Sequence, residues 1–197
     1  DAGPHFLEFL RELSIECHKN NLVVSVDNPV PEDFTSHYDR KEQGLVVDYI
    51  IIMGYDEHYV GSDAGSVASL PWVEQGVQDT VTEVTPERTI LAIPFYTRLW
   101  KTAGGAVTSE AIGMDEAQNV LRANAVEPVW DGSVGQNYAT FEQDNSTYQS
   151  WLEYAQSIAE KVKLIPKYGL AGVAEWKLGF ENSNIWQTIS DNITSAK

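Results

Sequence analysis

The sequence is poor in cysteine and in basic residues. Cys17 is the only cysteine among 197 residues, so no disulfide can form within the chain. It falls on the apolar stripe of a predicted helix, and we interpret it as a packed thiol rather than a nucleophile. Lys and Arg total 13 against 29 Asp and Glu, a formal net charge of −16. This balance argues against a nucleic acid or an anionic membrane as partner, because both require a basic surface.

Long hydrophobic runs and cofactor signatures are also missing. No apolar run reaches the ~18 residues that a membrane span needs, and no secretory signal is present. The glycines form no phosphate-binding or dinucleotide pattern. Asp56, Glu57, His58 and Asp63 match no standard metal-ligand spacing. The sequence therefore predicts no metal and no cofactor, in a globular chain that is 43% hydrophobic.

Three apolar runs stand out, and each breaks into aromatic and charged residues. They span residues 48–59, 89–100 and 169–180. Runs of this kind are typical of strands buried on both faces of a parallel sheet, whose carboxyl ends carry ligand sites in α/β proteins. The residues at these ends are Tyr55, Asp56, Tyr96, Arg98, Glu175 and Trp176. Together they predict one binding site for a polar, ring-shaped ligand.

Helix and strand patterns alternate along the chain. This order predicts parallel strands joined by right-handed crossovers. Residues 104–147 break it with one short helix, 114–123, and polar strands around Asp131-Gly132 and Asp144-Asn145, so we expect an α+β insertion over residues 101–147. The expected strands are 22–26, 46–55, 89–96 and 170–174, and the other expected helices are 4–19, 71–84, 148–168 and 184–193.

Two interpretations of the strand ends remain open. Asp56 and Glu175 could be the paired carboxylates of an ordinary glycosidase. We favour the alternative that Glu175, next to Trp176, points to the other side of its strand. Small residues around Trp176 leave room for its ring to stack on a sugar, although a packing role alone would also explain it.

The motifs resemble glycoside hydrolase family 18, the chitinase-like (β/α)₈ TIM barrels, and most closely its bacterial spore-germination and cell-wall branch. Residues 53–56 (MGYD) look like the sixth-strand signature, 93–100 (IPFYTRLW) like the seventh strand, and 169–181 (GLAGVAEWKLGFE) like the eighth. The acidic motif D-x-x-D-x-D-x-E of the fourth strand is absent. The resemblance thus implies an α/β fold with only the second half of the barrel, strands five to eight. Residues 1–197 would be a partial catalytic domain, excised from a longer protein and lacking the catalytic Glu.

The resemblance also implies a function and a site. The parent would hydrolyse β-1,4-linked N-acetylglucosamine glycans by a substrate-assisted retaining mechanism, with peptidoglycan favoured over chitin, outside the bacterial cell or in its envelope. The alternative is a chitinase-like lectin that binds glycan without cleaving it. The open edges of a half barrel would favour association with partner strands. By resemblance, Tyr55 donates to the acetamide oxygen, Asp56 holds a sugar hydroxyl, Met53 lines the pocket and Trp176 forms its floor, with Asp27, Asn28, Tyr96 and Arg98 at the rim.

Overall fold

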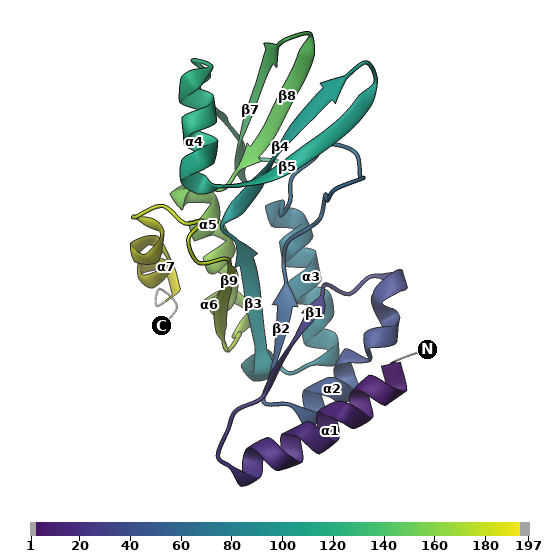
Figure 1. Cartoon of the computed structure of the whole chain (residues 1–197). Coiled ribbons are helices and arrows are strands. Elements are labelled where there is room, and N and C mark those ends of the chain that lie inside the picture. The colour runs from purple at the N-terminus through teal and green to yellow at the C-terminus, as the bar shows by residue number, and fades with distance from the viewer. Residues whose placement is uncertain (1–2, 194–197) are drawn as a thin grey trace.

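The computed structural model describes residues 3–193, which form two β-sheets with helices around them. Figure 1 shows the antiparallel sheet and helix α4 (Met114–Ala123) at one end of the molecule and the parallel sheet with most of the helices at the other. The candidate site lies where the two sheets meet.

The parallel sheet has four strands in the order β1-β2-β3-β9, and all neighbours run parallel. The prediction of parallel strands joined by helices is therefore confirmed. The strands are β1 (Ser25–Pro29), β2 (Tyr49–Met53), β3 (Thr89–Pro94) and β9 (Gly172–Trp176). In the described chain, β1 and β9 each have a neighbour on one side only.

Helices cover one face of this sheet. Ile50, Ile52, Leu91 and Ile93 are completely buried on that face, whereas Ile51, one residue along β2, remains partly exposed on the other. The apolar runs predicted strands covered on both faces, and one of these faces is left partly open here. The helices are α1 (Gly3–Lys19), α2 (Arg40–Val46), α3 (Leu70–Glu83), α5 (Ala155–Val162), α6 (Leu164–Tyr168) and α7 (Ile185–Ile193), with 3₁₀ turns η1 (Asp33–Tyr38) and η2 (Pro86–Arg88).

All four strand predictions differ from the structure at their boundaries, and the expected strands 22–26 and 46–55 differ most. The strand expected at 22–26 begins at Ser25, because the ladder with β2 starts there and the side chains of Leu22 and Val23 are 56% and 71% exposed. The strand expected at 46–55 is shorter, since residues 40–46 form helix α2, which the sequence analysis missed.

The antiparallel sheet has five strands in the order β5-β4-β8-β7-β6. Its strands extend beyond both ends of the range 101–147. The helix expected at 148–168 was wrong in its first part: residues up to Leu152 pair with β4 and β7, and a helix begins only at Ala155, where the Tyr154 amide donates to Ser157 Oγ. The strands are β4 (Tyr96–Ala103), β5 (Ala106–Gly113), β6 (Val129–Asp131), β7 (Gln136–Gln143) and β8 (Ser146–Leu152).

A buried polar network links the antiparallel sheet to helix α5 and to the loop after β2. Lys161 Nζ lies 2.8 Å from Glu153 Oε1, and both side chains are 0% exposed. Glu153 also accepts from Gln136 Nε2 at 2.7 Å and from Ser157 Oγ at 2.7 Å. Gln136 in turn accepts a hydrogen bond from Ser66, in the loop that follows β2. The network thus runs from helix α5 through the antiparallel sheet to the loop that follows the candidate site residues.

Candidate functional site

The site lies at the carboxyl edge of the parallel sheet, where Met53, Ala92 and Ala174 stand in register on neighbouring strands. Residues in register share a face, and side chains alternate along a strand. Trp176, two residues after Ala174, therefore lies on the same face as Met53. This is the partly open face, opposite the buried isoleucines.

Asp56 is held by Tyr96, the first residue of β4. Tyr96 Oη donates to Asp56 Oδ1 at 2.5 Å, and the Tyr55 and Tyr96 rings meet edge to face with centroids 6.2 Å apart. Asp56 has φ of +66°, in the left-handed region that short polar side chains tolerate better than most. This backbone turn ends the strand and points the chain into the 57–69 loop.

Burial and negative charge keep both phenols protonated. Burial raises the pKa of Tyr55 to about 12, with further contributions from Asp27 and Asp56. Burial also raises the pKa of Tyr96, and its hydrogen bond to Asp56 acts in the same direction. A protonated phenol is a hydrogen-bond donor, so Tyr55 can donate to an oxygen of a ligand.

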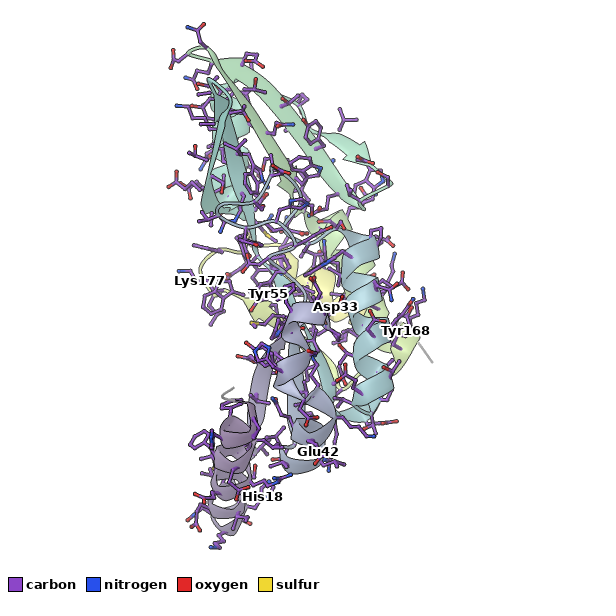
Figure 2. The ribbon with its side chains drawn as sticks, turned by 90° about the vertical axis from the view of Figure 1, so that its right-hand side faces the viewer. His18, Asp33, Glu42, Tyr55, Tyr168 and Lys177 are labelled. Carbon is purple, nitrogen blue, oxygen red and sulfur yellow. The ribbon has the colours of Figure 1, made fainter. Side chains whose placement is uncertain are left out.

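A pocket of about 380 Å³ opens beside these residues. Met53, Tyr55 and Asp56 line it from β2 and its end. Figure 2 places Tyr55 at mid-height of the molecule, between the antiparallel sheet above and the helices below. The remaining lining residues come from the end of β1 and the segment after it, from the 57–69 loop and from α3: Pro29, Val30, Glu32, Phe34, Thr35, Tyr59 and Trp72.

Sequence reasoning missed most of these lining residues. Trp72 was given no role in the site, but it lines the pocket and also contacts both buried clusters of the parallel sheet. Phe34 and Glu32 lie in a segment that the sequence analysis left without a role. The sequence did offer a signal, because an aromatic and an acidic residue follow shortly after a strand end. The prolines around these two residues made the segment look like a connecting loop.

The other expected site residues are distributed unevenly. Asp27 is exposed on β1, and its charge reaches Tyr55. Trp176 is 53% exposed, and its carbonyl accepts from the Phe95 amide at 2.7 Å. Arg98 donates to Ser109 Oγ at 3.0 Å on β5. Asn28 is 0% exposed and donates to Gln43 Oε1 at 2.8 Å, so its side chain faces the helices instead of the pocket.

Glu175 lies on the opposite face from Met53 and Trp176. It is in register with Ile93, which is completely buried against the helices. Burial raises the pKa of the Glu175 carboxyl, and no hydrogen bond to this side chain is present in the described chain. A pairing of Glu175 with Asp56 across one ligand is not supported by this arrangement.

We expect Glu175→Gln to stabilise the protein at pH 7 and to lose this advantage as the pH falls below about 4, near the pKa of an unfolded Glu. A carboxyl whose pKa is raised by folding carries no penalty below its unfolded pKa, and it destabilises the fold as the pH rises through the folded pKa. Thermal unfolding of both proteins between pH 3 and 8 measures the difference. Equal melting temperatures throughout would contradict the burial argument.

Within residues 3–193, no group of three or more His, Cys, Asp or Glu side chains is arranged to hold a metal ion. Over the same range, no helix is both long and apolar enough to cross a membrane.

Comparison with known proteins gives a consistent result. Residues 2–181 match the model of glycosyl hydrolases family 18. The chain is 25% identical over 191 residues to the glycosylase YvbX of Bacillus subtilis (strain 168), covering 93% of this chain and 55% of YvbX. It is 24% identical over 200 residues to a cortical fragment-lytic enzyme of the same organism, covering 96% of this chain and 46% of that enzyme. The chain thus spans about half the length of these relatives.

Solved structures share its fold. A chitinase from Chromobacterium violaceum ATCC 12472 superposes with a TM-score of 0.90 at 24% identity, covering 98% of this chain and 62% of the chitinase. The spore cortex-lytic enzyme SleL of Bacillus megaterium QM B1551 gives 0.87 at 21% identity, covering 100% of this chain and 47% of SleL. The family expected from the strand-end motifs is confirmed: the chain belongs to glycosyl hydrolases family 18.

Proposed function

We propose that this chain is part of a glycosidase that cleaves β-1,4-linked N-acetylglucosamine glycans, with peptidoglycan favoured over chitin and action at the cell envelope. The observation that carries the proposal is the Tyr96–Asp56 hydrogen bond beside the protonated Tyr55 phenol, at the open edge of the sheet. The names of the relatives, which include cortical fragment-lytic enzymes, favour the cell wall as the target.

The proposed chemistry is substrate-assisted. The N-acetyl carbonyl of the substrate attacks its own anomeric carbon, and a Glu outside this chain protonates the leaving oxygen. Tyr55 donates to the acetamide oxygen and so holds it in position to react. Asp56 holds a sugar hydroxyl, Met53 lines the pocket and Trp176 offers an exposed ring for stacking. Tyr96 acts indirectly, because its hydroxyl fixes the Asp56 carboxylate in place.

We further propose that the parallel sheet is the second half of a (β/α)₈ barrel, with the antiparallel sheet as an insertion. Strands in sequential order, helices on one face and a partly open second face all support this. So does the share of the relatives that the chain covers. The unpaired edges of β1 and β9 would then be the surfaces through which the chain associates with further strands.

Binding of an N-acetylglucosamine tetramer tests the site. We expect Asp56→Ala and Trp176→Ala each to weaken binding at least tenfold, because each removes a direct contact worth about 1.5–3 kcal/mol. Trp130→Ala is the matched control, since this indole lies on β6, an edge strand of the antiparallel sheet, and not on the parallel sheet that carries Trp176. Calorimetry measures the affinities. An unchanged affinity in both site variants would refute the assignment, whereas binding without turnover by the longer protein would favour a lectin.

A further inference from the structure

We propose that the part of the pocket lined by Glu32, Phe34 and Tyr59 binds a hexosamine unit whose amino group is free and positively charged. This unit would be adjacent in the glycan to the one that Asp56 holds. The inference rests on the proposed function and narrows its substrate class to glycans that carry some units without their acetyl group.

The walls of the pocket suit a sugar ring. Its volume of about 380 Å³ falls within the range of small-molecule sites. Two aromatic lining side chains are largely exposed, Phe34 at 75% and Tyr59 at 57%. Exposed rings at a pocket offer flat apolar surfaces on which the C–H face of a sugar can stack. Since Asp56 and Tyr55 line the same pocket, a ring held there is continuous with the candidate site.

The charge of the pocket selects among sugar units. The charged side chains that line it are Glu32 and Asp56, both carboxylates. Asp27 adds to the negative field, because its charge contributes to the raised pKa of Tyr55. An ammonium group in this pocket is attracted by these carboxylates, whereas a neutral acetamide gains no such attraction.

One cationic side chain, Arg40, lies behind the pocket wall, but its hydrogen bonds are already made within the protein. The Arg40 guanidinium is 1% exposed and donates to the carbonyl oxygens of Pro29 and Val30 and to Thr35 Oγ1. Its Nη1 also faces Glu83 Oε1 at 4.0 Å. Arg40 therefore cannot reach an anionic ligand in the pocket. Its role is to hold the segment that carries Glu32 and Phe34.

Affinity for defined tetramers tests the inference. At about pH 6, we expect a tetramer with one free amine next to an acetylated unit to bind this chain about tenfold more tightly than the fully acetylated tetramer. Glu32→Gln should reduce this preference to about threefold or less. The change keeps the 3₁₀ turn η1, because the hydrogen bonds between Glu32 and Thr35 that close it use only the backbone N–H and C=O of Glu32. Glu116→Gln, on the exposed side of α4, is the matched control and should keep the full preference.

Two results would overturn the inference. One is equal or weaker binding of the tetramer with the free amine. The other is a preference that Glu32→Gln and Glu116→Gln leave alike. If the acetylated tetramer still binds and still depends on Asp56, only the inference fails. If neither tetramer binds, the proposed function fails with it. A preference that weakens as the salt concentration rises would support the electrostatic origin.

Discussion

Lys161→Met is expected to lower the free energy of unfolding by about 3–5 kcal/mol, because it leaves the Glu153 carboxylate buried without its cation. Both side chains are completely buried, and the ammonium approaches both carboxylate oxygens, at 2.8 and 3.1 Å. Gln136 and Ser157 would continue to donate to Glu153, but neither carries a compensating charge. Urea unfolding followed by circular dichroism measures the loss.

Lys163→Met provides the control for this prediction. Lys163 pairs with Glu160 at 2.7 Å on the same stretch of chain, but its side chain is 52% exposed. Surface pairs of this kind contribute about 0–1 kcal/mol. A loss in Lys161→Met no larger than in Lys163→Met would show that the buried pair contributes no more to stability than a surface pair.

The second large effect concerns turnover. The 197-residue chain is expected to hydrolyse N-acetylglucosamine glycans at least 10²–10⁴-fold more slowly than the longer protein that we propose carries it. This rate factor is the contribution that a positioned general acid makes to such a reaction. Glu175 cannot substitute for it, because it lies on the opposite face of β9 from Trp176. The partly open face of the sheet also admits water, which weakens electrostatic contacts with the substrate.

Two substrates make this test specific: a chromogenic N-acetylglucosamine oligomer and purified peptidoglycan, each given to the chain and to the longer protein. Clear turnover by the chain that disappears in Glu175→Gln would restore the paired-carboxylate interpretation. Turnover by the longer protein alone is the expected result.

The sequence predicted β2, β3 and β9 because each contains or follows a short apolar run with a distinct end, whereas most of β1 lies beyond the apolar run at 22–26. It failed at α2 and β8 for a common reason. The segment 40–46 contains Gly44 and few apolar residues, and it is stabilised by packing and by the Asp39 side chain, which accepts from the Glu42 amide. The strand β8 mixes polar and aromatic residues without a clear period, and its structure comes from pairing with β4 and β7. Neither contact can be inferred from neighbouring residues alone.

The candidate site shows the same division. Tyr55, Asp56 and Tyr96 follow apolar strands directly, and the sequence pointed to all three. What it could not provide was the hydrogen bond between Tyr96 and Asp56, which joins residues 40 positions apart. The side-chain direction of Asn28 was likewise not evident from the sequence. Asn28 stands beside Asp27, yet the alternation of side chains along β1 turns its amide toward Gln43.

The pairing of β3 with β9 has a consequence for how the molecule folds. Residues 95–171, which include the whole antiparallel sheet, lie between these two neighbouring strands. Closing so long a segment costs chain entropy, and contacts between distant residues form slowly. The hairpins β4–β5 and β7–β8 join residues close in sequence, so they can form first and bring the ends of the segment together. Refolding should therefore show protection of the hairpin amides from hydrogen exchange before those of β9, and the last strand should dock onto an already folded insertion.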